Sequence, residues 1–198
     1  MSCKTARQFC EDGMRQNNGL PVLRTLKNIA GLAIVPSERR PGENVTKYSF
    51  EDFTPGRVFP LGPKHVTVEE IIEFASEFDP QPMHLDEAAG RDSILGGLAA
   101  SGWHTSSMVM RMMIDSYLLN SLSEGSPGID LMEWKRPVLA GDTLSGRTTV
   151  LEARALRSRP GVGIVKLRHE AENQRGEIVS VSENSIMFRM AKAPETPA

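Results

Sequence analysis

A short segment of this 198-residue chain combines a carboxylate, an imidazole and two prolines. Asp79 and His84 are five positions apart, and Pro80 and Pro82 lie between them. Because proline fixes φ and restrains the residue before it, the two side chains could face one small volume and contact the same water molecule. An imidazole titrates near neutrality and a carboxylate can take or orient a proton, so the pair suits proton transfer at two neighbouring atoms. The alternative is structural: Asp79 caps or turns the chain, and His84 is a buried, hydrogen-bonded histidine.

A second candidate lies at the start of a long apolar stretch. Ser101 and Gly102 stand where we expect a helix to begin, and this helix would reach Leu122. The N–H groups of a first helical turn are unpaired and the helix dipole is positive there. The Gly102 N–H could therefore stabilise an oxygen that gains negative charge, and glycine would let a bound group approach the backbone closely. The alternative is an ordinary N-cap by Ser101.

Helices must hold both candidates in place. Thr67 and Glu70 form a capping-box pattern at the start of a first helix, which the two prolines end directly at the aspartate. Residues 79–101 are glycine-rich and are expected to be irregular. The second helix is apolar around most of its circumference, with Arg111 and Asp115 as its polar side, so we expect it to be buried.

The C-terminal half has the alternation and the turn residues of long antiparallel strands. We expect four of them, at residues 129–138, 143–155, 163–173 and 177–190. Short extended segments at 57–59 and 64–66 precede the first helix. A nearly all-apolar helix beside such strands predicts an α+β fold, in which a curved antiparallel sheet wraps around the helix. The element order and the absence of a glycine-rich phosphate motif argue against a βαβ nucleotide-binding fold.

The first 44 residues differ from the rest of the chain. They carry seven Lys or Arg against four Asp or Glu, and a segment with two prolines and a glycine at 36–42 follows their apolar stretch. We predict a peripheral or mobile arm at 1–44 with one short amphipathic helix between Leu20 and Ala30. One domain would then occupy 45–198, its last residues forming a disordered tail.

Composition excludes several classes of protein. A net charge of −2 provides no basic excess for a nucleic acid backbone, so we expect no nucleic acid partner. The longest charge-free run, 93–110, is too rich in glycine and serine for a membrane span, and no secretory signal opens the chain. Cys3 and Cys10 fit neither a disulfide scaffold nor a metal site, which predicts a reducing compartment, the cytoplasm.

Three segments together resemble the MaoC-type acyl dehydratases, a family that includes the (R)-specific enoyl-CoA hydratases. They are Asp79–Asp86, Gly96–Trp103 and Arg136–Leu144, in this order. The first segment is specific to the hydratases, and the last is shared more widely among hot-dog proteins. The resemblance covers 48–190 and implies the hot-dog fold and the addition or removal of water at an enoyl thioester. It also implies a homodimer with its two sheets joined edge to edge and the substrate near the interface.

The resemblance gives the candidate residues specific roles. It implies that Asp79 and His84 together bind and deprotonate water, and that the Gly102 N–H holds the enolate oxygen. No metal or redox cofactor is expected, because the thioester itself acidifies the α position. The family's asparagine between the catalytic pair is Gln81 here, so its amide can act only if the longer side chain reaches. The family's histidine before the glycine is Ser101 here.

Six residues are candidates for binding the substrate. They are Gln81, Met83, Ser101, Trp103, Lys135 and Arg136. Trp103 would close one side of an acyl pocket or pack into the core. Lys135 and Arg136 would contact the phosphates of coenzyme A or form an exposed charge pair at a strand end.

We therefore predict a cytoplasmic hydro-lyase of fatty acid metabolism, an enoyl-CoA hydratase or 3-hydroxyacyl-CoA dehydratase. Two alternatives stay open. A hot-dog acyl-CoA thioesterase is disfavoured by the hydratase spacing of Asp79 and His84. A non-catalytic regulatory module that binds acyl thioesters would have no use for both side chains.

Overall fold

A computed structural model describes residues 48–191 of the chain. Its helical elements are η2 (Phe50–Asp52), α2 (Val68–Phe78), α3 (Pro82–Leu85), α4 (Glu87–Asp92), α5 (Gly102–Met113) and the π-helical turn η3 (Ile114–Leu118). Its strands are β1 (Val58–His65), β2 (Ser123–Gly125), β3 (Ile129–Trp134), β4 (Thr143–Ala155), β5 (Val162–Glu172) and β6 (Ile178–Arg189). The predicted arm, its helix, both cysteines and the C-terminal tail lie outside the described residues, so they stay predictions.

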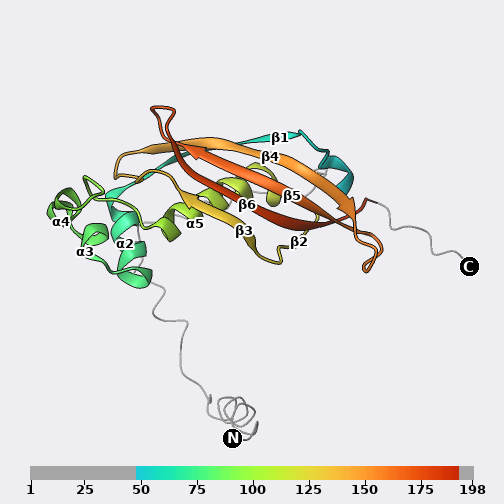
Figure 1. The fold of residues 1–198 in the computed structure, drawn as a ribbon, viewed down its shortest axis with the longest axis horizontal. Coiled ribbons are helices and arrows are strands. Elements are labelled where there is room, and N and C mark those ends of the chain that lie inside the picture. Colours follow the sequence, from blue (N-terminus) through green and yellow to red (C-terminus); the bar gives the residue numbers. More distant parts are fainter. Residues whose placement is uncertain (1–47, 192–198) are drawn as a thin grey trace, which may run out of the picture. The chain divides into compact units, whose positions relative to one another are not determined.

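One antiparallel sheet contains the six strands of residues 48–191. The strand order is β1-β4-β5-β6-β2, and β3 also pairs with β6. The long strands curve around α5, which lies against one face of the sheet (Figure 1). This confirms the predicted α+β arrangement of an antiparallel sheet wrapped around a helix.

The core lies between α5 and the inner face of the sheet. Met108 and Met112 of α5 are buried there with Leu144, Leu167 and Phe188 from three strands. Along β5, buried and partly exposed residues alternate, as the sequence pattern predicts. Burying each large apolar side chain contributes roughly 1.5–3 kcal/mol, so this layer fixes how α5 lies on the sheet.

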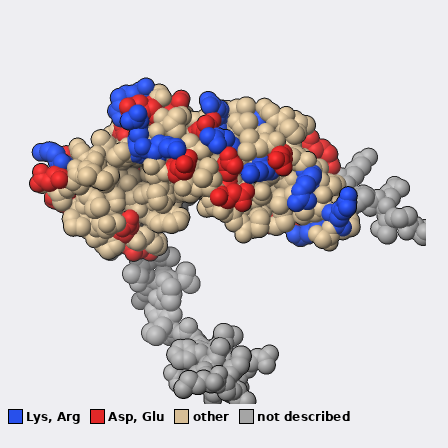
Figure 2. Space-filling view, viewed as in Figure 1, with Lys and Arg blue, Asp and Glu red and all other residues tan. Residues whose placement is uncertain are grey.

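The outer face of the sheet carries paired charges. Arg168 Nη1 of β5 lies 2.8 Å from Glu183 Oε1 of β6, and Arg147 Nη2 of β4 lies 2.7 Å from Glu170 Oε2 of β5. Lys and Arg are interspersed with Asp and Glu on the face that Figure 2 shows. Within residues 48–191, no helix has both the length and the apolar character to cross a membrane.

The structure corrects the predicted limits of the second helix and of the first C-terminal strand. The α-helix ends at Met113 and continues only as the π-helical turn, well before Leu122. The helix is also less buried than expected: Met110 is 46% exposed, because the sheet covers only one side of α5. Strand β3 ends at Trp134 instead of residue 138, since Pro137 has no N–H to donate to a neighbouring strand.

Residues 79–101 are more ordered than predicted. Pro82 occupies the first turn of α3, where its fixed φ suits a helix and its missing N–H costs nothing. The Asp86 side chain accepts a hydrogen bond from the Ala89 N–H at 2.8 Å and caps α4. The two extended segments expected before the first helix form one strand, β1, whose register with β4 shifts between Leu61 and Lys64.

Candidate active site

Asp79 stands at the C-terminal end of α2. Thr67 and Glu70 form the predicted capping box, with each side chain bonded to the backbone N–H of the other residue. The helix ends because Asp79 precedes Pro80, and a residue before proline is disfavoured in the α region. The Asp79 N–H still donates to the Ala75 carbonyl at 2.9 Å. The aspartate is thus the C-cap of a helix whose other end is fixed by its own cap.

Both oxygens of the Asp79 carboxylate accept hydrogen bonds. The Ser101 hydroxyl donates to Oδ2 at 2.6 Å, and the Gln81 amide donates to Oδ1 at 2.7 Å. The glutamine therefore reaches the carboxylate in spite of its extra methylene. The Ser101 bond, then the Gln81 bond, and finally the nearby His84 lower the pKa of Asp79 by favouring its charged form, against the opposing effect of burial.

His84 is buried in α3 and faces the carboxylate. Its Nε2 lies 3.7 Å from Asp79 Oδ2, which is too long for a direct hydrogen bond but allows one water molecule to contact both atoms. Its Nδ1 lies 2.8 Å from the Ala99 carbonyl oxygen. Because a carbonyl can only accept, Nδ1 carries a proton, and in the neutral form of the ring Nε2 presents a lone pair toward the aspartate.

Ser101 connects the two halves of the site. Its hydroxyl oxygen accepts from the Trp103 N–H at 3.3 Å, as an N-cap does, and the same hydroxyl donates to Asp79. The N-terminus of α5 is thereby attached to the end of α2. The serine, a predicted substrate contact, is bonded to the carboxylate in this structure.

Gly102 is the first residue of α5, so its N–H has no acceptor within the helix. A Cβ built on this glycine would lie 2.6 Å from the ring of Trp134, so the position requires glycine because the indole packs against it. This reason differs from the predicted one, a close approach of a bound group. The Trp134 Nε1–H donates to the Ser106 hydroxyl at 3.1 Å, which holds the indole over the first turn of α5.

The other candidates are more dispersed. Met83 is half-buried beside His84 in α3. Trp103 is 58% exposed, so it does not pack into the core of the described residues, and its ring meets Trp134 edge-on at 5.4 Å. Lys135 Nζ lies 2.8 Å from Glu133 Oε2, and Arg136 Nε lies 3.9 Å from Glu177 Oε1.

Lys135 and Arg136 thus form exposed ion pairs at a strand end. In the described part of the chain, neither side chain is ion-paired or hydrogen-bonded to Asp79 or His84. Within residues 48–191, no three His, Cys, Asp or Glu side chains come together in a way that could hold a metal ion. The arrangement at Asp79, His84 and Gly102 can activate a water molecule and accept a developing negative charge nearby.

Residues 52–173 match the family described as the MaoC like domain. The chain belongs to this family. The family is named for dehydratases.

Solved structures and a curated relative agree with the family. The MaoC-like dehydratase from Rhodospirillum rubrum is 40% identical, with a TM-score of 0.68, over 73% of this chain and 98% of that one. The unliganded (R)-hydratase PhaJ1 from Pseudomonas aeruginosa is 20% identical, with a TM-score of 0.60, over 77% and 95% of the two chains, and supports the hot-dog fold alone. The uncharacterised Bacillus subtilis protein YdeM is 29% identical over 139 residues, 70% of this chain and 97% of that protein.

The sequence does not predict two groups that shape the site. The Ala99 carbonyl fixes the tautomer of His84, and the Trp134 ring explains the glycine at 102. A backbone carbonyl leaves no signal in the residue type. Trp134 lies directly before the predicted Lys135 and Arg136, and only the pairing of β3 with β6 reveals that it faces α5.

Proposed function

We propose that this MaoC-like protein adds or removes water at the α,β double bond of an enoyl-CoA. The observation that carries the proposal is the 3.7 Å separation of Asp79 Oδ2 and His84 Nε2, with the orientation of each side chain fixed by other groups. A hydrogen-bonded carboxylate and a lone-pair imidazole nitrogen can hold one water molecule between them and take its proton.

The proposed hydration runs through these atoms. Asp79 accepts a hydrogen bond from one O–H of the water. His84 Nε2 takes the proton of the other O–H as the water oxygen attacks the β carbon. The carboxylate has lone pairs free for this because each of its oxygens can accept more than one hydrogen bond. The Gly102 N–H and the positive end of the α5 dipole stabilise the enolate oxygen, and the imidazolium, directly or through water, returns the proton to the α carbon.

Exposed apolar side chains support the proposed homodimer. Ile129 and Trp134 of β3 are 57% and 46% exposed, and Met110 and Trp103 of α5 are similarly open. Among residues 48–191, β3 pairs only with β6, so its other edge is available to a second strand. Large apolar side chains beside an unpaired strand edge favour association, and we propose that β3 joins β3 of a second copy.

A kinetic assay tests the proposed activity. The protein is incubated with a panel of enoyl-CoAs while the absorbance of the conjugated thioester and the release of free thiol are followed together. Loss of absorbance without thiol release is expected. Thiol release would instead identify a thioesterase, and no change in either signal would support a binding module.

A further inference from the structure

A cavity of about 550 Å³ lies between α5 and the inner face of the sheet. Its lining does not include Asp79 or His84, yet it begins at Trp103 and Ser106, within about one helical turn of Gly102. It ends at Met113, so it extends about 15 Å along the helix. This volume is within the range of small-molecule sites, and the near end adjoins the proposed thioester position.

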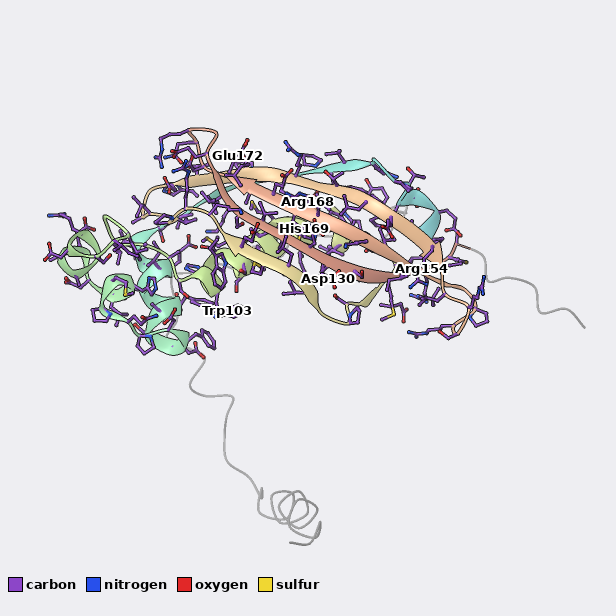
Figure 3. The ribbon with its side chains drawn as sticks, in the orientation of Figure 1. Trp103, Asp130, Arg154, Arg168, His169 and Glu172 are labelled. Carbon is purple, nitrogen blue, oxygen red and sulfur yellow. The ribbon has the colours of Figure 1, made fainter. Side chains whose placement is uncertain are left out.

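The large side chains that line the cavity are mainly apolar, with Ser106 and Ser107 of α5 among them, and a polar wall lies on the strand side. The large apolar side chains are Trp103, Val109, Met110, Met113, Ile129 and Met132. Trp103, Met110 and Ile129 also belong to the proposed dimer face, so a second copy would close the cavity on that side. The polar wall contains Ser126, His169, Ser180, Ser182 and Asn184. Figure 3 labels Trp103 near the start of α5 and His169 on the sheet. A site for a purely aliphatic chain has no need of a wall with hydroxyl, amide and imidazole groups.

The pairing of β6 with β3 places the polar side chains of β6 in order along the cavity. Ser180 pairs with Trp134, which packs on Gly102, so it is nearest the proposed thioester end. Ser182 follows, and Asn184, two residues further along β6, lies furthest from that end. The polar wall therefore runs along the length of the cavity, away from the double bond.

His169 and Asn184 are bonded to each other, whereas no side-chain partner of Ser180 or Ser182 is found among residues 48–191. His169 Nε2 lies 2.8 Å from Asn184 Oδ1, and its Nδ1 lies 2.9 Å from the Thr148 hydroxyl. Ser180 and Ser182 are 4% and 9% exposed, and no side-chain hydrogen bond within residues 48–191 engages either hydroxyl. Neither hydroxyl oxygen is among the fully buried unpaired atoms of the described residues, so both are accessible to water from the cavity. A ligand that displaces this water without replacing its hydrogen bonds loses affinity, whereas a ligand group that bonds to a hydroxyl keeps them.

The polar wall is neutral. Among the described residues that line the cavity, none is Lys, Arg, Asp or Glu. Burial lowers the pKa of His169, against the opposing effect of its bond to Asn184. In the neutral form of the ring, Nε2–H donates to Asn184 Oδ1 and Nδ1 accepts from the Thr148 hydroxyl. A carboxylate in this cavity would find no countercharge, whereas a hydroxyl or a ketone would find hydrogen-bond partners.

We infer that the cavity receives the acyl chain, and that Ser180 and Ser182 select a chain carrying an uncharged hydrogen-bonding group beyond the double bond. This inference rests on the proposed function and narrows its substrate class to enoyl thioesters with a hydroxyl or keto group on the chain. Plain aliphatic chains would leave the two hydroxyls unpaired.

Binding of saturated thioesters, which cannot be hydrated, tests the inference. Calorimetry compares hexanoyl-CoA, 6-hydroxyhexanoyl-CoA and adipoyl-CoA, together with the corresponding butanoyl series, on the full chain. The hydroxyl-bearing ligand of at least one series is expected to bind roughly threefold to tenfold more tightly than its methyl counterpart, the range for one hydrogen bond. The carboxylate-bearing ligands should bind most weakly. Tighter binding of methyl or carboxylate ends in both series would overturn the inference.

A matched pair of variants assigns the preference to the two serines. Ser180→Ala with Ser182→Ala should abolish the hydroxyl preference and leave hexanoyl-CoA affinity unchanged or improved. Ser185→Ala, on the same strand but outside this cavity, should keep the preference. A preference that survives the double substitution contradicts the assignment. If no enoyl-CoA is hydrated but the hydroxyl-bearing thioester still binds more tightly, the proposed function fails and the proposed selectivity stands. If enoyl-CoA is hydrated but the hydroxyl-bearing and methyl-bearing thioesters bind equally, the proposed function stands and the selectivity fails.

Discussion

At the residue scale, the Asp79 carboxylate is oriented before any substrate binds, because Ser101 and Gln81 each bond one of its oxygens. We expect Asp79→Asn and His84→Ala each to lower turnover by roughly 10²–10⁴-fold with folding retained, the range for a positioned acid or base. The double variant should be little worse than the poorer single one, because residues that act as a unit are not additive. Steady-state kinetics with circular dichroism measures both effects. Normal turnover in either single variant would contradict the assignment.

The Ser101 hydroxyl gives a prediction about pH. Its bond is the largest cause of the lowered pKa of Asp79, because it stabilises the charged carboxylate. Ser101→Ala removes that bond, so the Asp79 pKa should rise and the acidic limb of the kcat/KM profile should move to higher pH. The stability that the lowered pKa contributes is present above the unfolded pKa and is lost as pH falls through the folded pKa. In Ser101→Ala the folded pKa lies closer to the unfolded one, so this loss should be smaller and should be complete at a higher pH.

Ser76→Ala is the matched control for this profile. Ser76 is exposed on α2, and its hydroxyl donates to the Ile72 carbonyl of its own helix. Its pH profile should coincide with that of the unsubstituted protein. An acidic limb that stays in place in Ser101→Ala would show that Asp79 does not set it.

At the scale of elements, α2 connects a cap at one end with the proposed catalytic aspartate at the other. Thr67→Ala should lower the free energy of unfolding by about 1 kcal/mol, since the Glu70 N–H loses its acceptor. Turnover should change little, because Asp79 keeps its own bonds to Ser101 and Gln81. Urea unfolding followed by circular dichroism measures the loss.

Thr54→Ala provides the comparison for the cap. Thr54 is exposed and outside any helix, so its unfolding free energy should change within about ±0.5 kcal/mol. Equal effects of the two substitutions would mean that the capping box contributes nothing measurable to α2.

At the scale of the whole molecule, the chemical motifs all lie after residue 44. Deleting Met1–Asn44 should leave activity and dimerisation within about twofold and stability within roughly ±0.5 kcal/mol, as for changes away from packed sites. Sedimentation analysis and the hydration assay measure the outcome. Dissociation of the dimer or loss of activity would place the segment at 20–30 in the core or the interface.

The sequence was most informative where a local rule acts. The capping box at Thr67 and the alternation along β5 predict their elements because neighbouring residues decide both. The sequence predicts a helix that is longer and more buried than α5, because residue type alone does not tell which apolar side chains a sheet covers. The bond between Ser101 and Asp79 joins residues 22 positions apart, and only the packed fold brings them together.

The contact between Gly102 and Trp134 also constrains how such a chain can diverge. A side chain at 102 and an indole at 134 compete for the same space, so Gly102 cannot be replaced while the tryptophan remains. In a lineage of homologues, the tryptophan must be replaced by something smaller before alanine or serine can be accepted at 102. The reverse order passes through a clashing intermediate that selection would remove. The two columns of a sequence alignment should therefore vary together, although 31 residues separate them in the chain.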